Sequence, residues 1–158
     1  MSNSQSKQSV PADDFQLEPF YEKFKGNFTS CMRWDDLDIL WNILKQRANL
    51  NWYIYAIGKH VPDLPASENE LVLFITEMDN LLHSEHEKDY CGIVYADDKN
   101  SPTFIKIYDP NNLGVSCGFS NNPPLPGWVL SVIPPKPLED KSVLTQQRKR
   151  WWQRLWNK

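Results

Sequence analysis

The chain has 158 residues, about the size of a single domain, and it is 41% hydrophobic and 13% aromatic, a composition that excludes global disorder. Its formal net charge is −3, but the charge is unevenly distributed. Residues 1–140 contain all 20 acidic side chains and carry −9, whereas residues 141–158 carry +6. Because an acidic body repels phosphate, we expect no binding to nucleic acid.

The amino terminus and the cysteines lead to an expectation about location. Residues 1–14 contain no apolar stretch of the kind found in signal peptides, and no apolar run approaches the roughly 20 residues that span a bilayer. The cysteines lack the spacing of a disulfide framework, so reduced thiols explain them best. The sequence therefore predicts a cytoplasmic protein without a transmembrane segment.

The first third of the chain predicts a mobile segment and two helices. Residues 1–13 are rich in Ser, Gln and Asn, and we expect them to be mobile. Aromatic residues between positions 15 and 24 predict a short helix or an extended segment. The next helix begins at Asp35, and its apolar residues recur at the spacing of one helical face. These residues are Leu37, Leu40, Trp41, Leu44 and Ala48.

A strand and a well-capped helix are predicted in the middle of the chain. Residues 52–57 (WYIYAI) are apolar at every position, as expected of a central strand covered on both faces. The helix after it begins with a capping box, in which the Ser67 hydroxyl accepts from the amide of Glu70 while the Glu70 side chain reaches back. Its expected buried stripe consists of Leu71, Phe74, Ile75, Met78, Leu81 and Leu82.

The remaining strands complete the predicted fold. Residues 91–96 (CGIVYA) and 103–108 (TFIKIY) flank a polar turn and predict a β-hairpin. We expect a short strand at 115–119 and a last strand at 128–133 (WVLSVI). The order of elements favours an α+β fold, a single domain whose mixed or antiparallel sheet of four to five strands packs with two to three helices.

Residues 136–158 follow the predicted domain (14–135) as a linker and a basic, Trp-rich C-terminal amphipathic helix that begins at Ser142. On a helical wheel, an arc of roughly 140° holds its apolar side chains and the opposite side holds polar ones. The arc consists of Trp151, Trp152, Leu155 and Trp156, and the polar side of Arg150, Arg154 and Asn157.

This C-terminal helix predicts a docking element, because Trp and Arg dominate the hot spots of protein interfaces. The predicted partner-binding residues are Arg148, Arg150, Trp151, Trp152, Arg154, Leu155 and Trp156. On this interpretation, deleting residues 148–158 leaves the fold intact and abolishes binding of a partner protein. Two alternatives remain open: the helix packs onto its own body, or it binds an anionic membrane surface.

A second candidate site lies at residues 83–91. His83 and His86, three residues apart, can share a helix face, and Cys91 follows closely enough to supply a third ligand. Such a nitrogen and sulfur set would suit a transition metal such as zinc. A charged helix C-terminus, where His and Lys offset the helix dipole, explains the same pattern without a metal.

Two cysteines are candidate reactive thiols, Cys91 and Cys117, each of which is followed by a glycine. A thiol close to His86 would act as a nucleophile or a redox switch if its pKa were lowered. Cysteine is also among the residues most often buried, so a purely structural role is the alternative for both.

No stretch matches a catalytic or cofactor motif such as a Walker loop, G-x-G-x-x-G, G-x-S-x-G or H-E-x-x-H, and we expect no cofactor. The sequence favours a small non-catalytic interaction protein, an adaptor, assembly factor or regulator. One alternative is a metal- or thiol-dependent enzyme or sensor that uses His83, His86, Cys91 and Cys117. The other is a peripheral membrane-surface binder that uses the C-terminal helix.

Overall fold

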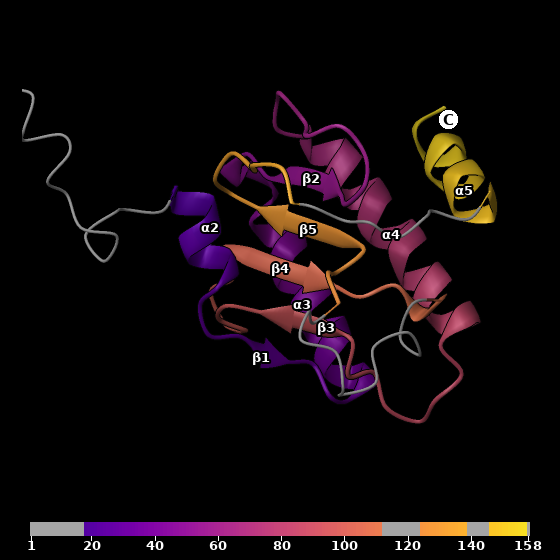
Figure 1. Cartoon of the computed structure of the whole chain (residues 1–158). Coiled ribbons are helices and arrows are strands. Elements are labelled where there is room, and N and C mark those ends of the chain that lie inside the picture. Colours follow the sequence, from indigo (N-terminus) through magenta and orange to yellow (C-terminus); the bar gives the residue numbers. More distant parts are fainter. Residues whose placement is uncertain (1–17, 112–123, 139–145, 158) are drawn as a thin grey trace, which may run out of the picture.

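Five short strands form one sheet in the order β1-β3-β4-β5-β2 (Figure 1). The computed structural model describes residues 18–111, 124–138 and 146–157, so the predicted segment 1–13, the strand at 115–119 and the helix start at Ser142 lie outside the described residues. The strands are β1 (Thr29–Ser30), β2 (Tyr53–Ala56), β3 (Val94–Ala96), β4 (Phe104–Ile107) and β5 (Trp128–Ser131). All neighbouring strands pair antiparallel.

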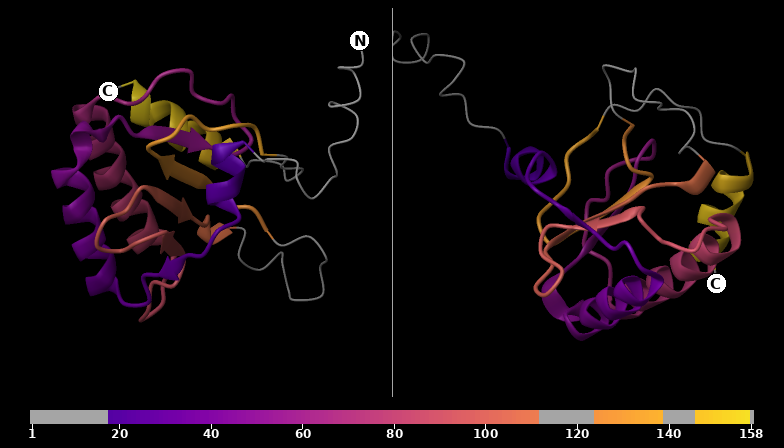
Figure 2. Two further views of the ribbon diagram at one scale, coloured as in Figure 1. Left: turned by 90° about the vertical axis from the view of Figure 1, so that its left-hand side faces the viewer. Right: turned by 90° about the horizontal axis from the view of Figure 1, so that it is seen from below.

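Four α-helices accompany this sheet in the described ranges, and the α+β fold is confirmed. They are α2 (Pro19–Phe24), α3 (Trp34–Gln46), α4 (Glu68–Glu85) and α5 (Gln146–Trp156), with a 3₁₀ turn at Ala48–Leu50 after α3. Helices α3 and α4 lie side by side on one face of the sheet, α2 lies on the other face, and α5 lies against α4 (Figure 2).

The alternation of side chains along the strands produces two apolar clusters, one on each face of the sheet. On β2, Ile54 and Ala56 point toward α3 and α4, whereas Tyr55 belongs to the cluster beneath α2. On β4, Ile105 belongs to the larger cluster and Phe104 to the smaller one. The larger cluster therefore packs against the two long helices and includes Leu155 of α5.

The prediction that residues 52–57 form a central strand is wrong, because within the described residues β2 lies at an edge of the sheet and β5 is its only partner strand. The prediction that both faces are covered is right: Ile54, Tyr55 and Ala56 are all buried. An apolar pattern on both faces indicates that other parts of the protein cover the strand from above and below. It does not indicate whether the strand lies at the centre or at the edge of the sheet. A passing segment covers part of this edge, since the Ala66 amide donates to the Trp52 carbonyl at 2.7 Å.

The local predictions for α4 and the hairpin are confirmed. The Ser67 hydroxyl accepts from the Glu70 amide at 3.1 Å, and the Glu70 carboxylate accepts from the Ser67 amide at 2.8 Å. Strands β3 and β4 form the expected antiparallel hairpin, although β3 begins at Val94. Among the helices in the described ranges, none is both long enough and apolar enough to cross a membrane.

Candidate functional site

The C-terminal helix α5 is attached to the body by a buried arginine. The Arg148 guanidinium, with 5% of its side chain exposed, donates to both oxygens of Asp109, from Nε at 2.8 Å and from Nη2 at 2.9 Å. It also donates to both oxygens of Glu85, at 2.7 and 3.3 Å. Burial alone would lower the pKa of Arg148, but the hydrogen bonds and charges of Asp109 and Glu85 outweigh it and raise that pKa. This arginine is therefore a fixed cation that joins α5 to α4 and to the end of β4.

The apolar arc of α5 packs against the same region of the body. Leu155 is buried in the larger apolar cluster, and the three tryptophans of the helix are partly buried against it. The ring centroids of Trp151 and Trp128 are 5.7 Å apart, and those of Trp152 and Phe74 are 6.5 Å apart. The amphipathic helix is thus confirmed, and its apolar face contacts the chain's own core.

The opposite face of α5 is exposed and basic. Arg150, Gln153, Arg154 and Asn157 line a shallow hollow of about 500 Å³. All four side chains are exposed, and α5 contains no acidic residue that could neutralise the two arginines within the helix. This face can donate hydrogen bonds to another molecule and can bind its negatively charged groups.

The predicted partner-binding residues accordingly divide into three groups by their exposure. Arg148 and Leu155 are buried in contacts within the chain, so their role in the structure is to hold α5 in place. Arg150 and Arg154 are exposed on the outer face. Trp151, Trp152 and Trp156 lie between these limits, each with part of its indole accessible.

The sequence contained a signal for the role of Arg148 that our interpretation did not use. Arg148 precedes Trp152 by four residues and Leu155 by seven, which places it on the apolar stripe rather than on the polar face. A charged side chain on a buried stripe requires a buried partner of opposite charge. Asp109 and Glu85, both distant in sequence, meet that requirement.

The predicted metal ligands His83, His86 and Cys91 are not brought together. The buried His86 ring is engaged through Nε2, which lies 2.8 Å from the Cys91 carbonyl oxygen, so it contacts the Cys91 backbone. The imidazole of His83 points elsewhere: its Nε2 lies 3.4 Å from Asp79 Oδ1, and its ring stacks on Trp34 at 4.2 Å. In the described part of the chain, the group of side chains close enough to share a metal ion includes His83 but neither His86 nor Cys91.

The candidate thiol Cys91 is fully buried and unpaired, as is Cys31. Burial raises the pKa of the Cys91 thiol, although backbone amides nearby lower it in part. Burial, together with the neighbouring Cys91, raises the pKa of Cys31 to about 12. Because the thiolate is the reactive species, these surroundings disfavour nucleophilic chemistry at both. Cys117 lies outside the described residues.

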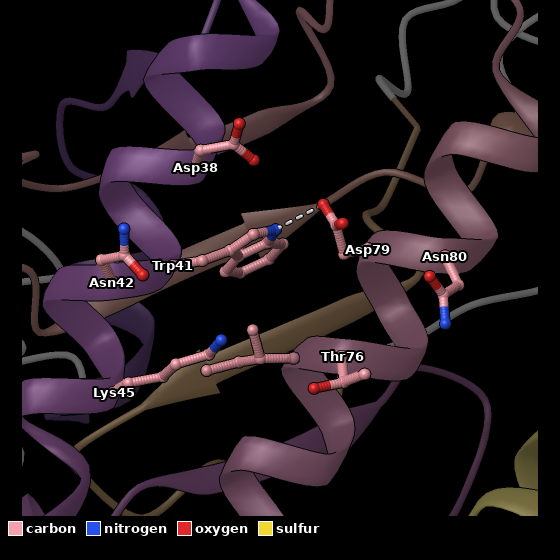
Figure 3. Close-up of a pocket in the computed structure, with 8 residues that line it drawn as sticks. Asp38, Trp41, Asn42, Lys45, Thr76, Asp79 and Asn80 are labelled. Atoms are coloured by element: carbon pink, nitrogen blue, oxygen red, sulfur yellow. Dashed lines mark hydrogen bonds between the residues drawn. The ribbon is translucent and has the colours of Figure 1, made fainter.

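A groove between α3 and α4 was not predicted. It has a volume of about 420 Å³ and is lined by residues that are mostly polar: Asp38, Trp41, Asn42, Lys45, Ile75, Thr76, Asp79 and Asn80. Trp41 reaches across from α3, and its Nε1 donates to Asp79 Oδ1 of α4 at 3.0 Å (Figure 3). The sequence separates Asp38 from Asp79 by 41 positions, so only the packing of the two helices brings them together.

No family model matches the chain, and neither curated proteins nor solved structures gave a significant match to it.

Proposed function

We propose that the protein is a small non-catalytic interaction protein, an adaptor, assembly factor or regulator, that binds an acidic surface of a partner protein through the outer face of α5. The observation that carries this proposal is that one face of α5 is buried against the body of the protein while the opposite, basic face is exposed. Arg148 and Leu155 are buried and hold the helix in place, while Arg150 and Arg154 stand exposed on its other side.

A docked helix favours binding for an energetic reason. The helix does not have to be ordered when the partner arrives, so less conformational entropy is lost on binding than with a free tail. The accessible edges of the three tryptophans border the basic face and supply apolar contact area beside the two charges. Arginine and tryptophan together are the residues most enriched in interface hot spots.

Charge reversal on the outer face tests the proposal without disturbing the attachment of α5. The double variant Arg150→Glu/Arg154→Glu changes only exposed side chains. The matched control, Lys25→Glu/Lys88→Glu, makes the same change of charge at exposed positions on other elements. Wild type and both variants are cross-linked in native lysate, and the affinity for the recovered protein is then measured with purified components.

The expected result is a loss of affinity of about tenfold or more for the α5 variant, since a hot-spot residue contributes more than about 1 kcal/mol and about 1.4 kcal/mol is a tenfold change in affinity. The control should bind within a factor of about two of wild type. Equal affinities for the two variants would contradict the proposal.

Vesicle flotation separates this proposal from peripheral membrane binding. A basic helix with tryptophans is also a common form of membrane-surface element. Full-length protein is mixed with anionic phosphatidylserine vesicles and with neutral vesicles. Flotation with the anionic vesicles alone, abolished by Arg150→Glu/Arg154→Glu, would replace the protein partner with a lipid surface.

A further inference from the structure

Three side chains of types that can ligate a metal, Asp38, Asp79 and His83, lie close together on α3 and α4, and the two aspartates line the groove between these helices. Asp38 comes from α3, and Asp79 and His83 come from consecutive turns of α4. One carboxylate oxygen of each aspartate and one ring nitrogen of His83 all lie within 4.8 Å of one another.

Two of these three side chains are already oriented by aromatic neighbours. Trp41, 4% exposed, holds Asp79 Oδ1 with its indole N–H at 3.0 Å. The His83 ring stacks on Trp34 with an interplanar angle of 28°, and its Nε2 faces Asp79 at 3.4 Å. Outer contacts of this kind fix ligand orientation in metal sites and raise affinity.

The surroundings leave room for further ligands. Asp38 and Asp79 are at the wall of the 420 Å³ groove, whose other lining residues include Asn42, Thr76 and Asn80. Figure 3 shows Asp38 on the same helix as Trp41, and Asp79 on the facing helix. A cation held there by three protein ligands would keep positions open to water or to a small anionic ligand.

We infer that Asp38, Asp79 and His83 form a binding site for a divalent transition metal ion of the zinc type. The imidazole favours such an ion over Mg²⁺ and Ca²⁺, which prefer oxygen ligands alone. Ligand atoms around zinc lie about 2.0–2.2 Å from the metal, so they must approach each other to about 3.5 Å. The Asp79–His83 pair already meets that spacing, and rotation of the exposed Asp38 side chain would close the remaining distance.

The test is a titration of the full-length protein, with any affinity tag removed, with Zn²⁺ by calorimetry and with Co²⁺ by visible absorption. A single equivalent of each metal is expected to bind, and Co²⁺ is expected to develop ligand-field bands. Asp79→Asn and His83→Gln should each weaken binding by about tenfold or more. Asp38→Asn should weaken it as well, which a simple Asp79–His83 helix pair would not require.

Matched controls separate this site from adventitious binding. His60 is exposed and lies outside the cluster, so His60→Gln should bind both metals as wild type does. Circular dichroism checks that each variant is folded, and all three ligands are at least partly exposed, so their substitution leaves the core unchanged. Absence of binding at millimolar metal, or equal loss of affinity in His60→Gln, would overturn the inference.

Discussion

Arg148 holds the last helix in place by charge as well as by shape. Its guanidinium satisfies two carboxylates, and one of them, Asp109, has only 5% of its side chain exposed. Asp109 also accepts a hydrogen bond from the Asn111 amide, so both oxygens of its carboxylate have hydrogen-bond donors. Removing one partner of such a buried pair costs more than the pair contributed, because the other charge stays buried without compensation.

Arg148→Ala is therefore expected to lower the free energy of unfolding by about 3–5 kcal/mol. The measurement is urea unfolding followed by tryptophan fluorescence. Arg150→Ala, on the exposed face of the same helix, is the matched control and should change stability by no more than about 0.5 kcal/mol. Similar unfolding midpoints for the two variants would show that the Arg148 contacts contribute little.

Asp97 organises the turn of the β3–β4 hairpin, and its hydrogen bonds predict how the stability of the fold depends on pH. Its carboxylate accepts hydrogen bonds from the Thr103 hydroxyl and amide, from the Phe104 amide and from Lys23. Burial alone would raise the pKa of Asp97, but these hydrogen bonds outweigh it and lower that pKa. The folded state thus favours the ionised form more than the unfolded state does.

The stabilisation from Asp97 is fully present above its unfolded pKa, near 3.8, and is lost as the pH falls through the lower folded value. Asp97→Asn is expected to lower the free energy of unfolding at pH 7 by about 1.5–3 kcal/mol. The difference from wild type should shrink as the pH is lowered below 3.8. Asp35→Asn, an exposed substitution, is the control, and a pH-independent difference for Asp97→Asn would contradict this account.

At the scale of the element, α5 is both attached and exposed, and this changes what its deletion is expected to do. The sequence predicted that the fold stays intact without residues 148–158. Leu155 is buried in the core, with 2% of the residue exposed, so we now expect the deletion to destabilise the fold. Truncation before Gln146 removes the partner of Asp109 and Glu85 and uncovers apolar surface on α4 and β5.

The truncated chain is expected to lose at least as much stability as Arg148→Ala, about 3 kcal/mol or more, with a further contribution from the apolar area uncovered. Thermal unfolding by circular dichroism measures it. Arg150→Glu/Arg154→Glu is the comparison, because it keeps the helix docked and should unfold near the wild-type temperature. A truncated protein as stable as wild type would restore the description of a separable tail.

At the scale of the whole molecule, the charge asymmetry acts over distance. The body carries −9 and residues 141–158 carry +6, of which Arg148 is neutralised by Asp109 and Glu85. The exposed arginines of α5 therefore form a local basic region on an acidic protein, which on the proposed function would attract an acidic partner toward α5.

Affinity for the partner is expected to fall as salt rises, because the Debye length shrinks from about 10 Å at 0.1 M to about 3 Å at 1 M. The measurement is the dissociation constant at several salt concentrations. The Arg150→Glu/Arg154→Glu variant should show a weaker dependence on salt than wild type. A wild-type affinity independent of salt would assign the interaction to the tryptophans alone.

The local features of the fold were predictable from the sequence because each depends on neighbours along the chain. The capping box at Ser67, the α4 stripe and the hairpin all come from spacing within a few residues. The candidate metal site was not predictable, since Asp38 and Asp79 lie on different helices. The proximity of His83 and His86 in the sequence suggested a shared site that their side-chain directions do not form.

The sequence alone determined the apolar faces of α3 and α4, the positions where these two helices begin, and the amphipathic character of α5, but it did not predict strand β1. Tertiary structure decided the edge position of β2, the burial of Arg148 between Asp109 and Glu85, and the meeting of Asp38 with Asp79 and His83. The physical reason is that periodicity encodes the direction of a side chain relative to its own element. Which other element it meets depends on how the helices and the sheet pack together.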